Sequence, residues 1–184
     1  MIQGFATSEG TGNFEARFGQ TSQTGFFREL QGLHLASIGL GTYLGEMDDS
    51  TDEASFRAVE ALVAGGVNVI DSAINYRGQR SERTIGRALK DLIGKGKLKR
   101  EELFISTKGG FLPFDGEFPS NPHAFFDTEY IRSEILKPGD VIQGCHAMTP
   151  NYLENQIERS LKNLGAECID LYYVHNPETQ LLLS

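Results

Sequence analysis

The chain has too few cysteines for a disulfide-rich or zinc-binding protein, and its apolar runs are too short for a membrane protein. Only two of its 184 residues are cysteines, Cys145 and Cys168, so neither a disulfide framework nor a zinc site is expected. No apolar run approaches the ~20 residues of a membrane helix, and the N-terminus has no apolar segment resembling a signal peptide. These absences predict a cytoplasmic protein with two free thiols and no membrane partner.

Basic residues are outnumbered: 17 Lys and Arg stand against 25 Asp and Glu, for a formal net charge of −8. A chain this acidic is not expected to bind nucleic acid or an anionic membrane. One basic run, 95–100, lies between a predicted helix and a predicted strand, which indicates a solvated connector. With 39% hydrophobic residues, the length suits one domain with its own core.

Short apolar runs alternate with amphipathic helical patterns. The apolar runs are at 38–42, 67–70, 103–107 and 169–174, and the helical patterns are at 48–65, 81–93 and 150–164. Strands that are apolar on both faces and alternate with helices predict a parallel α/β sheet covered by helices. No G-x-G-x-x-G motif follows the first strand, so a dinucleotide-binding doubly wound sheet lacks its usual fingerprint. A (β/α)8 barrel is the better prediction.

Three segments lie outside this alternation. Residues 1–25 are rich in Gly, Ser and Thr without periodicity, and we expect a flexible N-terminal arm. The segment 26–36 predicts a hairpin that turns at Gln31 and Gly32. A long loop at about 109–149 holds most of the prolines, with a short helix expected near 128–136.

The 109–149 loop has two interpretations. In one, Phe111, Phe114 and Phe118 form a lid over an apolar substrate; in the other, the loop is a mobile insertion. His123 and His146 lie in this loop without the spacing of metal ligands, and His34 lies in the hairpin. We interpret all three histidines as structural or solvated, and we expect no metal site.

Four ionisable residues follow the predicted strands: Asp71, Tyr76, Lys108 and His175. The carboxyl ends of parallel strands meet at one rim, where α/β folds hold their sites. Lys108 is expected to pair with Asp71, and a cation beside Tyr76 favours release of the phenolic proton. His175 can then hold a carbonyl oxygen. Each residue alone also fits a structural role, such as a helix cap, but their joint placement predicts a catalytic site.

Five motifs together resemble the aldo-keto reductase family, and the resemblance runs from Phe26 to the last residue. They are IGLGT at 38–42, DSAINY at 71–76, GQRSERTIGRAL at 78–89, STK at 106–108 and YYVHNP at 172–177. The resemblance implies a (β/α)8 barrel that uses NADPH, or less often NADH, to reduce an aldehyde or ketone. Residues 26–184 would form the N-terminal half of that barrel.

The resemblance also implies roles for individual residues. Tyr76 would be the proton donor, tuned by Lys108 and Asp71, while His175 orients the substrate carbonyl. Tyr76, His175 and Phe111 would contact the substrate. The nicotinamide side of the cofactor would be lined by Gly41, Thr42, Asp71 and Asn176.

The chain stops after its fourth strand, whereas a (β/α)8 barrel usually takes about 250 residues. In the family, most contacts to the adenosine and phosphates of the cofactor come from the later strands. We therefore expect the second half of the barrel to come from a longer chain or from a second polypeptide.

Two other functions remain open at this point. The first is a Schiff-base enzyme such as an aldolase, in which Lys108 is the nucleophile. The second is a regulatory subunit that binds the cofactor with little turnover. The family also resembles ion-channel β subunits, which behave in this way.

Overall fold

The computed structural model describes residues 1–18 and 23–182. Its main sheet has four parallel strands in the order of the sequence: β3 (Leu40–Gly41), β4 (Val69–Asp71), β5 (Phe104–Gly109) and β6 (Leu171–Val174). Each new strand is added at the same edge, so the chain never reverses as a doubly wound sheet does. The fold is therefore the barrel type that the sequence predicts, with its first four strands in this chain.

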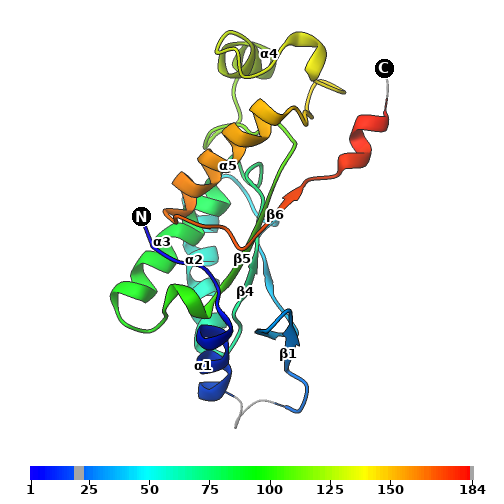
Figure 1. The fold of residues 1–184 in the computed structure, drawn as a ribbon. Helices are drawn as coiled ribbons and strands as arrows, with labels where there is room; N and C mark the ends of the chain where they lie inside the picture. Colours follow the sequence, from blue (N-terminus) through cyan, green and yellow to red (C-terminus); the bar gives the residue numbers. More distant parts are fainter. Residues whose placement is uncertain (19–22, 183–184) are drawn as a thin grey trace.

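Three helices cover one face of this sheet, on the left of the strands in Figure 1: α2 (Asp49–Ala64), α3 (Arg80–Gly94) and α5 (Pro150–Leu164). Asp48 begins α2 by accepting from the Thr51 amide, and Gly165 ends α5 with φ +63°. Ile70 and Ile105 point to this side, where buried hydrophobic residues form the main core of the described part of the chain. They are Phe14, Val59, Val63, Ile70, Ile85, Ala88, Leu89, Leu92, Leu98, Leu103, Ile105, Leu164 and Ala166.

The opposite face of the sheet has no helix among the described residues. Successive residues of a strand point to opposite faces, so Asp71, Ser106 and Lys108 share this face with Tyr173, the register partner of Lys108. Tyr173 is 46% exposed. The uncovered face therefore carries the polar residues of the candidate site.

Residues 8–18 form helix α1 (Ser8–Phe18) where the sequence predicted a flexible arm. Its Gly, Ser and Thr content gives little intrinsic helicity, but Phe14 is fully buried against Phe18 and Phe27. Thr11 also accepts a hydrogen bond from the His34 amide. Tertiary contacts therefore hold the helix; residues 19–22 of the predicted arm lie outside the described residues.

The predicted hairpin is present as β1 (Phe27–Leu30) and β2 (Leu33–Ala36), which pair antiparallel. Gln31 (φ +52°) and Gly32 (φ +80°) form its turn. In Figure 1, the hairpin lies at the lower end of the sheet, where the strands begin. The Asn68 side chain links this hairpin to β4 through the Ala36 amide.

The 109–149 loop folds into three short helical segments: α4 (Pro122–Phe126), the π-helix η2 (Asp127–Ile131) and the 3-10 helix η3 (Pro138–Asp140). They start before the predicted helix at 128–136, because Asn121 accepts from the Ala124 amide and Pro122 occupies the first turn. A second core, separate from the main one, forms from Leu112, Tyr130, Leu136, Ala147 and Tyr152. The loop is thus a small packed unit at the top of Figure 1.

The basic run 95–100 is not solvated throughout. It leads into the 3-10 helix η1 (Arg100–Glu102), where the Arg100 side chain is 3% exposed and pairs with Asp170 at 2.8 Å. The sequence of the run does not show which of its basic residues is buried, because the partner of Arg100, Asp170, lies 70 residues away in the chain. None of the helices in the described part of the chain is long and apolar enough to cross a membrane.

Candidate active site

The Lys108 ammonium lies at the centre of the candidate site. It donates to Asp71 Oδ2 at 2.6 Å, to the Ser72 carbonyl at 2.6 Å and to the Tyr76 hydroxyl at 3.2 Å. The side chain is only 16% exposed, at the end of β5. An ammonium has three protons, and these three acceptors engage all of them.

The Asp71 carboxylate, at the end of β4, is held by two strands at once. Its second oxygen accepts from Ser106 Oγ at 2.8 Å, and Ser106 is two residues before Lys108 on the same face of β5. The carboxylate side chain is 40% exposed, on the uncovered face of the sheet. Sequence reasoning missed Ser106, although its two-residue spacing from Lys108 was a usable signal.

His175 follows β6 and faces Tyr76. The two rings are 5.7 Å apart in an edge-to-face arrangement, and Nδ1 of His175 lies 3.1 Å from Oδ1 of Asn75. Burial, and next the nearby Lys108 charge, lower the pKa of His175 below its ordinary value. The imidazole is therefore neutral at neutral pH.

His146 supports the backbone of His175 from the 109–149 loop. It is fully buried, and its Nε2 lies 2.7 Å from the His175 carbonyl oxygen. A carbonyl can only accept, so Nε2 carries the proton and Nδ1 accepts from the Gln180 amide at 2.8 Å. The interpretation of His146 as structural holds, but its proximity to the site was not visible in the sequence.

A cavity of about 430 Å³ lies in front of these side chains, lined by Tyr43, Asn75, Tyr76, Phe111, His175 and Asn176. The Phe111 ring packs edge-on against His175 at 5.1 Å, and Tyr43 packs edge-on against Tyr76 at 5.1 Å. Tyr43 and Asn75 were missed, although each is adjacent in sequence to a predicted site residue.

Only one of the three predicted lid residues reaches this cavity. Phe114 packs on Phe118 at 4.7 Å and stacks on Phe126 at 5.0 Å, inside the 109–149 loop, and neither Phe114 nor Phe118 lines the cavity. Phe118 lies at the edge of this aromatic cluster, where it is 69% exposed. Phe111 alone contacts the site.

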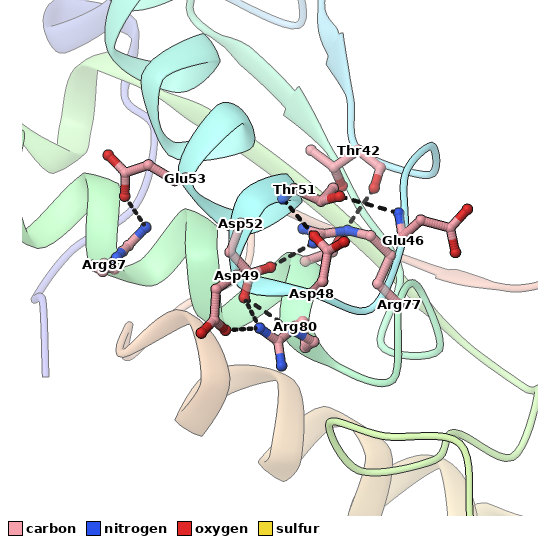
Figure 2. Close-up of polar contacts among 11 residues, drawn as sticks. Thr42, Glu46, Asp48, Asp49, Thr51, Asp52, Glu53, Arg77, Arg80 and Arg87 are labelled. Carbon is pink, nitrogen blue, oxygen red and sulfur yellow. Dashed lines mark hydrogen bonds and ion pairs between the residues drawn. The ribbon is translucent and has the colours of Figure 1, made fainter.

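The 72–80 loop that carries Tyr76 is tied to the first turn of α2. Figure 2 shows Arg77 and Arg80 reaching Asp52, at 2.5 and 2.6 Å. The Arg77 side chain is 2% exposed, and Arg80 also pairs with Asp49. Ser81 Oγ donates to the Thr42 carbonyl at 2.7 Å, so the same region holds the end of β3.

Three of the four predicted cofactor residues present open groups on the uncovered face. A Cβ on Gly41 would meet nothing within 4 Å, Asn176 lines the cavity, and Asp71 is partly exposed. Thr42 differs, because it is buried and its hydroxyl bonds the Asp71 carbonyl and Ser72 Oγ. The Thr42 hydroxyl therefore holds β3 to β4 and is not offered to a ligand.

This geometry is unfavourable to a Schiff-base mechanism. A nucleophilic amine needs a free lone pair, whereas Lys108 donates to three oxygens, one of them a carboxylate. The Tyr76 oxygen accepts from Lys108, so its own O–H proton is available to another acceptor. Within residues 1–18 and 23–182, no group of three His, Cys, Asp or Glu side chains could hold a metal ion.

The sheet order, the strand-end residues and the motifs point to one family of barrels, and comparison with known proteins identifies it. The model of the Aldo/keto reductase family matches residues 37–182, so the chain belongs to that family. It is 28% identical to aldose reductase B of Dictyostelium discoideum over 148 residues, covering 78% of this chain and 33% of that protein. Over 141 residues it is 30% identical to human aldo-keto reductase family 1 member C2, covering 76% of this chain and 31% of that protein.

A solved structure is similar as well. The putative aldo-keto reductase from Pseudomonas aeruginosa aligns with a TM-score of 0.53 and 25% identity, over 83% of this chain and 48% of that one. The chain thus spans about a third of the length of these curated relatives and about half of the solved one.

Proposed function

We propose that this chain supplies the catalytic rim of an NAD(P)H-dependent oxidoreductase that reduces an aldehyde or ketone to an alcohol. The observation that carries the proposal is the placement of Lys108 Nζ, 2.6 Å from Asp71 Oδ2 and 3.2 Å from the Tyr76 hydroxyl. This contact sits beside a cavity that His175 also lines. Family membership supports the same reaction class.

In this proposal, Tyr76 gives its proton to the carbonyl oxygen. When bound, the nicotinamide supplies the hydride that reduces the carbonyl carbon, so one hydride and one proton complete the alcohol. The phenolate left on Tyr76 is stabilised by the ammonium of Lys108, which the Asp71 carboxylate holds in place. The neutral His175 ring holds the carbonyl oxygen, and Phe111 and Tyr43 give the cavity apolar walls.

NADPH is the proposed cofactor, with NADH as the alternative, and its nicotinamide would contact Gly41, Asp71 and Asn176. We further propose that the second half of the barrel, on a longer chain or a second polypeptide, binds the rest of the cofactor. The uncovered face with Tyr173 46% exposed is consistent with a covering partner.

The test is NADPH and NADH oxidation by the complete protein that carries this chain, with a panel of aldehydes and ketones. Tyr76→Phe keeps the ring and removes only the proton donor, so turnover should fall by a factor of about 100 or more. Cofactor binding, followed by the change in NADPH fluorescence, should remain. Turnover in Tyr76→Phe equal to that of the wild type would refute the proposal.

A further inference from the structure

Asn75 anchors one end of the His175 ring. Its Oδ1 lies 3.1 Å from Nδ1, while Nε2 has no hydrogen-bond partner among residues 1–18 and 23–182. Both residues line the cavity together with Tyr76. Nδ1 is therefore the held end of the ring, and Nε2 is the end left for a ligand.

The identity of the Asn75 atom that faces Nδ1 decides where the proton of the neutral ring lies. When Oδ1 faces Nδ1, the ring must carry its proton on Nδ1, and Nε2 presents a lone pair. When the amide NH2 faces Nδ1, the ring carries its proton on Nε2 and can donate into the cavity. A carbonyl oxygen has only lone pairs, so it is bound by the second arrangement and repelled by the first.

The Asn75 amide is able to change between these arrangements. In the described part of the chain its side chain makes no hydrogen bond except the one to His175. A half-turn of the amide therefore exchanges Oδ1 and Nδ2 without breaking a bond to a third residue. The backbone of His175 stays fixed meanwhile, since its amide donates to the Gly109 carbonyl and its carbonyl is held by His146.

We propose that Asn75 is a positioning residue that sets the tautomer of His175. In the structure Oδ1 of Asn75 faces Nδ1; after a half-turn of the amide, its NH2 donates to Nδ1, so that Nε2–H binds the substrate carbonyl. The proposal rests on the proposed function, since it assigns the means by which that site selects a carbonyl oxygen. Because burial lowers the pKa of His175, the neutral ring has one proton, and its position matters.

Charged and titratable groups around the His175 ring affect the test. Lys108 faces it from β5, Asp71 from β4, Glu178 from the 3-10 helix η4 (Pro177–Leu181), and His146 from the 109–149 loop. Asn75→Asp keeps the shape of the side chain but can only accept, and it favours the doubly protonated ring at low pH. Asn75→Leu removes donor and acceptor alike and leaves the tautomer unbiased.

Two measurements on the complete protein test the proposal. The first is kcat/KM for NADPH-linked reduction of 4-nitrobenzaldehyde between pH 5 and pH 9, in the wild type and both variants. At pH 9 we expect Asn75→Asp to lose about tenfold or more and Asn75→Leu to lose less, with the Asp variant recovering as the pH falls. If Asn75 only filled space, Asn75→Leu should lose more kcat/KM than Asn75→Asp, because Asp is nearly isosteric with Asn.

The second measurement is the nitrogen-15 NMR shifts of His175 with oxidised NADP and benzaldehyde, a mixture in which no hydride is available. The wild type should show a protonated Nε2, and Asn75→Asp at pH 9 a protonated Nδ1. A protonated Nε2 in that variant at pH 9, or a larger loss in Asn75→Leu than in Asn75→Asp, would overturn the proposal. If the wild type reduces no carbonyl compound, the proposed function fails, but the NMR shifts still decide the tautomer.

Discussion

At the scale of single residues, the ionisable groups of the site differ in how many hydrogen-bond partners surround them. Lys108 has three oxygen acceptors, whereas the His175 ring is half-buried with an anchor at one nitrogen only. The desolvation of His175 therefore dominates over the nearby Asp71 carboxylate, and its pKa falls. Its charge state gives a prediction that does not depend on turnover.

We expect His175 to contribute a pH dependence to stability. The pKa of His175 is lower in the folded chain than in the unfolded chain. Between these two pKa values the unfolded chain binds more protons, so the free energy of unfolding falls as the pH drops through the ordinary histidine range. Below the folded pKa this loss of stability levels off. The measurement is urea unfolding of the wild type and His175→Gln between pH 5 and pH 8. A wild-type curve parallel to that of the variant would contradict the prediction.

At the scale of elements, two sets of contacts position the helices that pack around the site. α3 and α5 approach so closely that a Cβ on Gly86 would lie 2.6 Å from the Asn163 carbonyl oxygen and 2.7 Å from that of Leu164. These are backbone atoms at the end of α5, and backbone atoms cannot relieve a clash by changing rotamer as a side chain can.

Gly86→Ala should therefore destabilise the protein by about 2 kcal/mol, because overpacking outweighs the better helix propensity of alanine. Gly94 lies on the same helix and a Cβ there would meet nothing within 4 Å. Gly94→Ala should be neutral or stabilising by up to about 1 kcal/mol. Thermal unfolding of both variants checks the pair, and equal stability losses would show that the close approach is not the cause.

The ion pairs between α2 and the 72–80 loop give a second prediction at this scale. Asp52→Asn leaves the guanidinium of Arg77, 2% exposed, without its carboxylate. We expect a loss of about 3 kcal/mol in the free energy of unfolding, and lower turnover because Tyr76 is adjacent to Arg77.

The neighbouring Glu53 is the matched control. Its pairs with Arg57 and Arg87 are exposed, since the Glu53 side chain is 47% accessible to solvent. Glu53→Gln should cost less than about 1 kcal/mol. Chemical denaturation of both variants separates the two cases, and an equal cost would show that burial of Arg77 is unimportant.

At the scale of the whole molecule, the sheet has one face packed by helices and one face without such a cover in the described part of the chain. Residues 1–184 produced alone should bind a dye for apolar surfaces and should not bind NADPH tightly. The complete protein, as one longer chain or as two polypeptides, should bind NADPH and exclude the dye. Native mass spectrometry and fluorescence titration make the comparison, and tight NADPH binding by residues 1–184 alone would refute the need for a second half.

The sequence by itself determined the order and type of the main elements and the residues that end their strands. Short apolar runs that alternate with helical patterns predicted the parallel sheet and its helices, because these signals are local. The placement of Asp71, Tyr76, Lys108 and His175 on one rim followed from strand order alone. The family motifs in the same places led to the same fold.

Only the tertiary structure decided the contacts between distant segments. Helix α1 forms because Phe14 is buried against the hairpin, and Arg100 is buried because Asp170 meets it. His146 and Asn75 join the site because the 109–149 loop and the 72–80 loop fold back to His175. Such contacts depend on the free energy of packing residues that are far apart in sequence. A local sequence pattern contains no information about that free energy.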